Sequence, residues 1–185
     1  SILVTLLNQP TSTVFEQKLK EAIDFQKLSQ SIPRGETRDQ TYEILLESSM
    51  SAVFADAAWL EVKEESGITQ VIRNLKDEEV DEIKGAIKGE TIKSILKLEL
   101  KTLANPGKLT DDLKHSQFKS IIALPIMVQD KQEGYIVLLN EVSEAFNREM
   151  VNIITTFVNQ ASVSLENLSL IKESIENERY KEQLK

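Results

Sequence analysis

The sequence predicts an α+β domain with a central antiparallel sheet, helices on both faces of that sheet and a long C-terminal helix that projects from the domain. Three observations support this fold class. Two almost wholly apolar runs, 120–128 and 134–140, flank the polar segment 130–133, as in a buried antiparallel hairpin. Apolar residues recur every three or four positions in several other segments, which indicates helices. From residue 143 onward, neither proline nor glycine interrupts such a pattern.

Two helices are expected before the first strand. The first spans about residues 13–31, where Thr13 and Glu16 have the spacing of a capping box. The segment 31–36 contains a proline and a glycine, both of which interrupt helices. The second helix should therefore begin after this break and run over residues 38–54.

A hairpin and a further helix are expected next. Residues 57–62 predict a strand, 64–67 a turn and 68–73 the returning strand. Residues 76–88 predict a helix, and its first turn is acidic, which interacts favourably with the helix dipole. The sheet is therefore expected to contain this hairpin beside the two buried strands.

The segment that follows has a less regular pattern. Residues 91–97 predict a short helix. Residues 99–104 are compatible with an extension of that helix or with a short strand, and the strand is preferred. Residues 105–115 predict another helix, with Pro106 at a favourable place near its start.

The C-terminal helix is too long to pack entirely on its own domain. About 40 residues, each rising 1.5 Å, make a helix of about 60 Å. A globular core of roughly 130 residues is only about 35–40 Å across. The far end must project, and pairing with a second copy in a coiled coil would cover its apolar stripe. The candidate dimer-interface residues are Phe15, Leu19, Ala161, Leu165, Leu168, Ile171 and Ile175.

These lengths divide the chain into three parts. Residues 1–35 are expected to form an N-terminal helical extension, 36–168 the globular domain and 169–185 a projecting linker helix. Residue 1 is serine rather than methionine, so the sequence is expected to be part of a longer protein. In that protein an output domain is expected to follow the linker.

The composition excludes several kinds of chemistry. The chain has no cysteine, which excludes disulfides, thiolate metal sites and cysteine nucleophiles. His115 is the only histidine, so the chain cannot build a metal site from two or three histidines. These exclusions favour a protein that is not an enzyme.

Charge and hydropathy bear on partners and location. The net charge of −8 argues against a nucleic-acid partner or an anionic membrane surface. No apolar run approaches the ~18–20 residues that span a membrane, and the apolar opening residues lack the basic flank of a signal peptide. We therefore expect a cytoplasmic location and no direct membrane insertion.

The polar residues do not assemble a catalytic or metal site. His115 lies at a predicted helix end, where an imidazole suits the carbonyl dipole, with axial haem ligation or a general-base role as alternatives. Acidic pairs such as Asp111 and Asp112 are explained by helix starts better than by metal binding. The glycines form no phosphate-binding loop, and no serine lies in a nucleophile elbow. We predict a non-enzyme without metal or cofactor.

Four segments carry a resemblance to a known family. They are Ala55–Leu60, the proline-containing strand Phe118–Ile126, the glycine-led strand Gly134–Asn140 and the helical segment Phe157–Asn167, with Phe146 before the last. In this order the chain resembles a GAF domain over roughly residues 36–170. The resemblance implies an antiparallel sheet with helices on one face. On the other face a variable middle, about 75–118, encloses a small-molecule pocket in sensing members.

The resemblance also implies where a ligand would bind. The pocket candidates are Trp59, Ile83, Ile87, Leu103, Leu109, Leu113, His115, Phe118 and Asn140. Cyclic-nucleotide-binding members carry a signature that Asn140 and Phe146 match, but Glu141 stands where it requires lysine, so this ligand class is not expected. Without cysteine, covalent pigment attachment and the sulfoxide-reductase chemistry of some relatives are excluded.

The polar tail, residues 177–185, resembles the linker before PPM-type serine/threonine phosphatase domains of bacterial regulators. Similar helices precede histidine kinases and other output domains. Two functions are therefore compatible with the chain. One is a sensory module that binds an unknown small molecule and signals through the helices of a homodimer. The other is a ligand-free dimerisation and spacer module, which continuous packing of the variable middle would favour.

Overall fold

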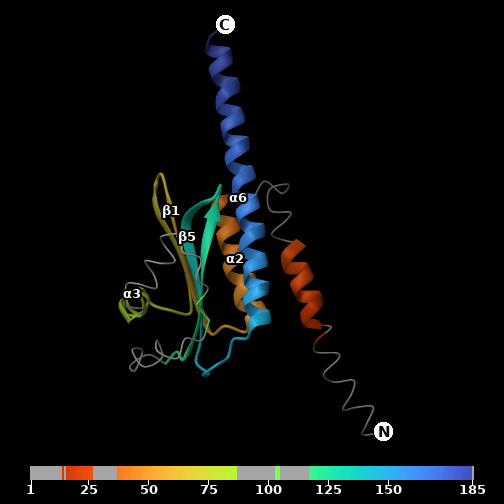
Figure 1. Cartoon of the computed structure of the whole chain (residues 1–185). Coiled ribbons are helices and arrows are strands. Elements are labelled where there is room, and N and C mark those ends of the chain that lie inside the picture. Colours follow the sequence, from red (N-terminus) through yellow and green to blue (C-terminus); the bar gives the residue numbers. More distant parts are fainter. Residues whose placement is uncertain (1–13, 15, 27–36, 87–102, 105–116, 185) are drawn as a thin grey trace.

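The computed structural model describes residue 14 and residues 16–26, 37–86, 103–104 and 117–184 (Figure 1). An N-terminal helix over 16–26 precedes the main domain. Among the described residues the domain contains the helices α2 (Arg38–Val53), α3 (Asp77–Ala86) and α6 (Arg148–Gln183). Its strands are β1 (Ala57–Glu64), β2 (Gly67–Arg73), β3 (Leu103–Ala104), β4 (Ser120–Val128) and β5 (Lys131–Asn140).

The five strands form one antiparallel sheet in the order β2-β1-β5-β4-β3. Helices α2 and α6 cover one face, and α3 lies against the other (Figure 1). The predicted α+β class, with helices on both faces and a projecting C-terminal helix, is confirmed. Of the strand expected at 99–104, Leu103 and Ala104 form β3, which pairs Leu103 with Ala123, and 99–102 lie outside the described residues. The helices expected at 91–97 and 105–115 lie outside the described residues.

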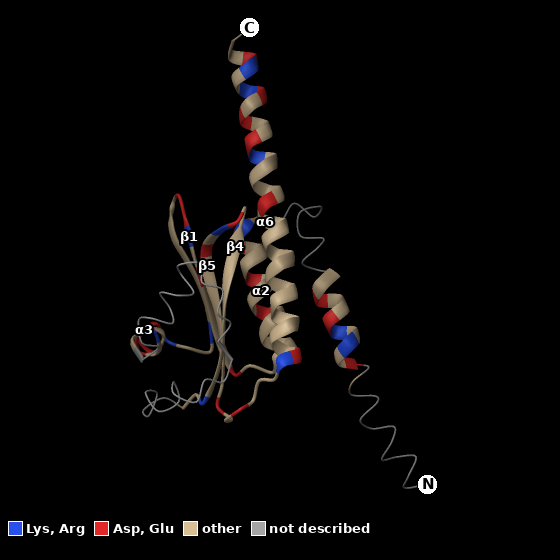
Figure 2. Cartoon of the chain, in the orientation of Figure 1, with Lys and Arg blue, Asp and Glu red and all other residues tan. Residues whose placement is uncertain are grey.

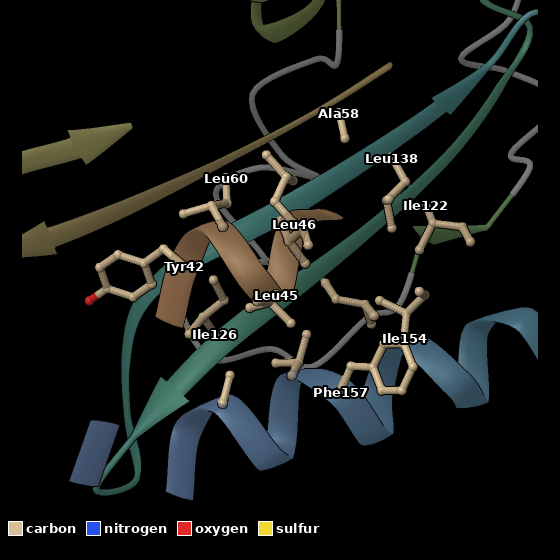
Figure 3. Close-up of a cluster of buried hydrophobic side chains, with 14 of the residues drawn as sticks. Tyr42, Leu45, Leu46, Ala58, Leu60, Ile122, Ile126, Leu138, Ile154 and Phe157 are labelled. Atoms are coloured by element: carbon tan, nitrogen blue, oxygen red, sulfur yellow. The ribbon is translucent and has the colours of Figure 1, made fainter. Parts of the chain in front are cut away.

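The larger core lies between the sheet and the helices α2 and α6 (Figure 3). Strand side chains alternate between the two faces of a sheet, so Ala58 and Leu60 point into this core while Trp59 points to the opposite face. The main contributors are Tyr42, Leu45 and Leu46 from α2, Leu60, Ile122 and Leu138 from the sheet, and Ile154 and Phe157 from α6. This packing fixes the two long helices on the sheet.

Helix α2 begins and ends as its sequence requires. Thr37 and Gln40 form a capping box, in which each side chain accepts a hydrogen bond from the other residue's backbone amide. Phe54 caps the C-terminal end in the left-handed conformation, with φ 53°. The predicted span 38–54 is confirmed within one residue.

The turn between the two buried strands differs from the expected one. A turn over 130–133 was expected, but the turn residues are Gln129 and Asp130, with φ 51° and 60°. Two consecutive positive φ angles are typical of a type I′ turn, whose twist matches that of the flanking strands. Strand β5 therefore begins at Lys131, and the irregular register beside Ile126 and Met127 accommodates Glu133.

Helix α6 is 36 residues long, about 54 Å at 1.5 Å per residue. It begins at Arg148 rather than near residue 143, because Asn147 caps it by accepting a hydrogen bond from the Met150 amide at 2.8 Å. Its last buried residue is Leu165. Glu166 and Ser169 still contact the domain, and the part beyond them projects (Figure 1). Figure 2 shows that charged residues of both signs line the projecting part. Of the described helices, none combines the length and the apolar character that crossing a membrane requires.

Candidate functional site

The face of the sheet opposite α2 and α6 carries a second, smaller apolar cluster. Residues of β1, β4 and β5 form its floor, and Val80 and Ile83 of α3 cover part of it. Its members are Ala57, Trp59, Val80, Ile83, Phe118, Ile121, Ala123, Tyr135, Val137 and Leu139, all at most 4% exposed. This cluster lies where the sequence analysis expected a pocket, and its floor is rigid because it belongs to the central strands.

Trp59 and Tyr135 form the polar edge of this cluster. Their rings meet edge to face, with centroids 6.4 Å apart and an interplanar angle of 86°. The Trp59 Nε1 donates to the Tyr135 hydroxyl at 3.4 Å, and that hydroxyl donates to Glu61 Oε2 at 3.3 Å. The same carboxylate pairs with the ammonium of Lys84, from α3. A continuous polar chain thus runs from β5 through β1 to the helix above the sheet.

The electrostatics of this chain follow from burial and from the charge on Glu61. Burial raises the pKa of Tyr135, because it disfavours the phenolate. Burial acts to lower the pKa of Lys84, but its interactions with Glu61 and Tyr135 together outweigh this effect, so the pKa lies above its ordinary value. At neutral pH the chain therefore consists of a neutral phenol between an indole and an ion pair.

The candidate pocket residues are only partly brought together. Trp59, Ile83 and Phe118 share this cluster. The structure corrects the assignment of Asn140 to the pocket. Its side-chain nitrogen donates to the Phe54 carbonyl at 3.0 Å, and its side-chain oxygen accepts from the Val142 backbone amide at 2.8 Å. It therefore holds the chain at the end of β5, because both ends of its side chain are taken by backbone groups. Leu103 belongs to β3. Ile87, Leu109, Leu113 and His115 lie outside the described residues.

Comparison with protein families decides the classification. The model of the GAF domain matches residues 37–165, well over half of the chain. The chain belongs to the GAF domain family. The matched residues contain the whole sheet and both apolar clusters of this GAF domain. A search of curated proteins finds no match.

Solved GAF structures share this fold. A GAF domain of a putative sensor histidine kinase from Pseudomonas syringae pv. tomato is 17% identical, with a TM-score of 0.61, 92% of this chain and 99% of that chain covered. A phycoerythrobilin-bound GAF domain from a cyanobacterial phytochrome is 10% identical, with a TM-score of 0.60 and coverages of 84% and 99%. Residues 122 to 287 of a methyl-accepting chemotaxis protein are 17% identical, with a TM-score of 0.55 and coverages of 78% and 98%. At these identities the likeness establishes the fold.

The candidate dimer residues fall into two groups. Leu19, Ile171 and Ile175 are about half exposed, at 51%, 47% and 48%, and Leu168 is partly exposed. The structure corrects the assignment of Ala161 and Leu165 to the dimer interface, because both are fully buried in the core between α2, α6 and the sheet. Both are therefore unavailable to a partner. They were assigned to the interface because the apolar stripe of α6 that faces the core continues without a break into the projecting part. Phe15 lies outside the described residues.

The N-terminal helix packs beside the lower parts of α2 and α6 (Figure 1). Gln17 Nε2 donates to the Ala52 carbonyl at 3.2 Å, and Lys18 forms an ion pair with Glu149 at 3.0 Å. An open groove of about 210 Å³ lies between this helix and the end of α2, beside Phe54. This groove is on the α2 side of the sheet and is separate from the candidate site.

Sequence reasoning missed the polar chain of the candidate site. Tyr135 follows a glycine in an apolar strand, a pattern that indicates burial but does not identify a hydrogen-bond partner. The partnership of Glu61 with Lys84 cannot be read from either segment, because it joins β1 to α3 across 23 residues. An alternating strand that places a charge between apolar neighbours is the one feature that draws attention to Glu61.

Alkaline pH is expected to destabilise the domain. Burial raises the pKa of Tyr42 and of Tyr135 above the ordinary value, and Tyr42 also donates to Glu64 at 2.7 Å. The unfolded chain therefore loses these phenol protons first, near about pH 10, so the free energy of unfolding falls as pH rises beyond that value. Urea denaturation between about pH 9 and pH 11 measures this slope. The double variant Tyr42→Phe with Tyr135→Phe should show a flatter slope, and an unchanged slope contradicts the assignment.

Proposed function

We propose that this GAF domain is a non-catalytic sensory module that binds a small molecule on the α3 face of its sheet. In this proposal the ligand changes the arrangement of a homodimer formed through the N-terminal and C-terminal helices. The projecting part of α6 then passes the change to an output domain. The proposed location is the cytoplasm.

The projecting helix is the observation that carries this proposal. Beyond Leu165 no residue of α6 is buried, yet Leu170, Ile171 and Ile175 are apolar and 55%, 47% and 48% exposed. A solitary helix with such residues gains by pairing with a second copy, since burial of each apolar side chain contributes about 1.5–3 kcal/mol. A helix that continues to Gln183, far beyond its last buried residue, supports a role for this segment outside the domain.

The α3 face supports the ligand part of the proposal. Its described wall is apolar with a few convergent polar groups at one edge, which is the usual composition of a small-molecule site. A GAF domain with the same fold, from a cyanobacterial phytochrome, is described as phycoerythrobilin-bound. A ligand that binds one arrangement of the dimer more tightly than the other would shift the equilibrium between them.

A second candidate function is a ligand-free dimerisation and spacer module. It is favoured by the close packing of the cluster, in which Trp59, Tyr135, Glu61 and Lys84 satisfy one another. In that case the α3 face is a second core and the projecting helices only set the distance to the next domain. Ligand binding distinguishes the two functions.

Trp59 makes this test direct, because it is the single tryptophan of the chain and lies in the candidate site. We expect native mass spectrometry of protein from its own source to show an added small-molecule mass. Titration with a library of small metabolites should change Trp59 fluorescence and raise the melting temperature for the cognate compound. No added mass and no response to the library would favour the spacer module.

A matched pair of variants locates the binding. Tyr135→Phe removes one hydroxyl from the candidate site, and Tyr42→Phe removes one from the opposite face of the sheet. We expect Tyr135→Phe to weaken binding about tenfold, the effect of one lost buried hydrogen bond. Tyr42→Phe should leave the affinity unchanged. Equal effects of the two variants would place the ligand elsewhere.

A further inference from the structure

Four segments meet at the point where α6 leaves the domain. Arg38, the first residue of α2, donates from Nε to Glu64 Oε1 at 3.2 Å and from Nη2 to Glu133 Oε2 at 3.2 Å. Its Nη1 donates to the Ser169 hydroxyl on α6 at 3.0 Å. One guanidinium thus joins the end of β1 and the start of β5 to the helix, just beyond its last buried residue, Leu165.

A second contact holds the same turn of α6. The backbone amide of Gln129, in the β4–β5 turn, donates to Glu166 Oε1 at 2.8 Å. Glu166 and Ser169 are three residues apart and therefore lie on one side of the helix. The β4–β5 hairpin is consequently attached to one turn of α6 directly through Gln129 and indirectly through Glu133 and Arg38.

The charges around Arg38 make this arrangement sensitive to the position of the strands. Two carboxylates, Glu64 and Glu133, share the one cation, and their side chains are only 17% and 29% exposed. Burial raises the pKa of Glu133, and Glu64 adds to the effect, while the Arg38 charge opposes it. If Arg38 moves away, the two carboxylates repel each other across the strand ends.

The same two strands carry the candidate site. Glu61 and Tyr135 are directly paired between β1 and β5, and Glu64 and Glu133 lie three and two residues further along these strands. A shift of Tyr135 relative to Glu61 therefore displaces the carboxylates that hold Arg38. The β1–β5 pairing extends to Val62 and Gly134, one residue from Glu133 and two from Glu64, so only a short stretch of strand separates the site from the carboxylates.

We propose that Arg38 and Glu166 form a clamp on α6 that couples the β1–β5 strand pair to the projecting helix. With the clamp closed, the segment around residues 166–169 is held against the hairpin and the projecting part has one direction. With the clamp open, this segment is released and the helix pivots beyond Leu165. The inference rests on the proposed function only where it assumes a ligand that opens or closes the clamp. The contacts of the clamp themselves are present in the chain without ligand.

Amide hydrogen exchange of the full chain, without added ligand, tests the clamp. We expect Arg38→Met to speed exchange of α6 amides between residues 166 and 176 about tenfold, the effect of losing hydrogen bonds to a charged group. Ser169→Ala removes a single acceptor and should give a smaller increase in the same segment. Arg38→Lys keeps the positive charge but lacks the planar guanidinium that reaches three acceptors at once. Its α6 amides should therefore be protected only in part.

Arg73→Met is the matched control. Arg73 is 33% exposed, close to the 31% of Arg38, and it also pairs with two glutamates, Glu43 and Glu47. It joins β2 to α2 and does not contact α6 in the described structure. Arg73→Met should therefore leave exchange in α6 unchanged, and light scattering should confirm that all variants keep the oligomeric state of the parent chain.

A positional measurement complements the exchange data. The chain has no cysteine, so cysteines introduced at Glu65 and Asn177 carry the only spin labels. In protein diluted with unlabelled chain, we expect the distance distribution between these labels to broaden in Arg38→Met and to stay narrow in Arg73→Met. Unchanged exchange and unchanged distances in Arg38→Met and Ser169→Ala overturn the clamp. If Arg38→Met does not fold, Ser169→Ala and Glu166→Gln decide by the same two measurements.

The ligand test and the clamp test fail independently. A domain that binds no small molecule can still show faster exchange in Arg38→Met, which supports the clamp and contradicts the sensory function. A domain that binds a ligand but shows no change in α6 retains the sensory function and loses the clamp.

Discussion

Replacing Gly134 with alanine is expected to lower the free energy of unfolding by about 3 kcal/mol or more. A Cβ at this position would lie 2.1 Å from the Glu61 carbonyl oxygen and 2.8 Å from the Val62 Cα. Both are backbone atoms of β1, which pairs with β5 along six residues in the middle of the sheet. Relief of the clash therefore requires the two central strands to separate, and urea denaturation measures the cost.

Gly85→Ala is the control for this substitution. Gly85 lies in α3, and among the described residues an added Cβ would meet no atom within 4 Å outside its chain neighbours and the backbone of its own helix. Alanine is favoured over glycine in a helix by about 0.5–1 kcal/mol, so this variant should be slightly more stable than the parent chain. The same chemical change thus has opposite signs at the two positions. A fully stable Gly134→Ala variant would contradict the close approach of β1 and β5.

Ile171→Glu combined with Ile175→Glu is expected to convert the proposed homodimer into monomers. The two side chains are 47% and 48% exposed on the projecting helix, so a pair of chains would bury four of them. Because each side chain is already about half buried, pairing would contribute about 0.7–1.5 kcal/mol for each one, and this contribution is lost while the new carboxylates repel each other. Light scattering at micromolar concentration measures the mass of the particle.

Asn177→Glu with Tyr180→Glu is the matched control for this pair. Both residues are exposed on the same part of α6, and they lie six and nine residues from Ile171, which places them on the opposite side of the helix from Ile171 and Ile175. This variant gains the same two charges and should remain a dimer. The sheet domain should stay folded in both variants, because no buried residue is changed. A monomeric parent chain would contradict the proposed dimer, and a dimeric Ile171→Glu and Ile175→Glu variant would place the interface elsewhere.

Local patterns predicted most of the elements correctly. The alternation of residues 57–62, the apolar runs of β4 and β5, and the helical spacing of α2 and α6 each depend on neighbours within a few positions. The errors lie where a local pattern has two solutions. The hairpin turn moved to Gln129 and Asp130 because the twist of the strands selects the turn type, and α6 began later because Asn147 supplied a cap.

The candidate site was predicted less well than the fold. Trp59, Ile83 and Phe118 were expected near one another because their apolar character and strand or helix position place them on one face. Asn140 was misplaced because sequence shows an amide at a strand end but not the carbonyl of Phe54 beside it. Ala161 and Leu165 were assigned to a dimer because a continuous apolar stripe does not show where the domain ends and solvent begins.

The sequence by itself determined the α+β class, the order of the elements, the projecting helix and the absence of cysteine chemistry. These properties follow from composition, from periodicity and from helix length, which are local or additive along the chain. Only the tertiary structure decided that Trp59, Tyr135, Glu61 and Lys84 form one polar chain, and that Arg38 holds Glu64, Glu133 and Ser169 together. The Arg38 contacts join residues 26, 95 and 131 positions apart. Side-chain periodicity specifies which face a residue occupies, whereas the partner it meets depends on how whole elements pack.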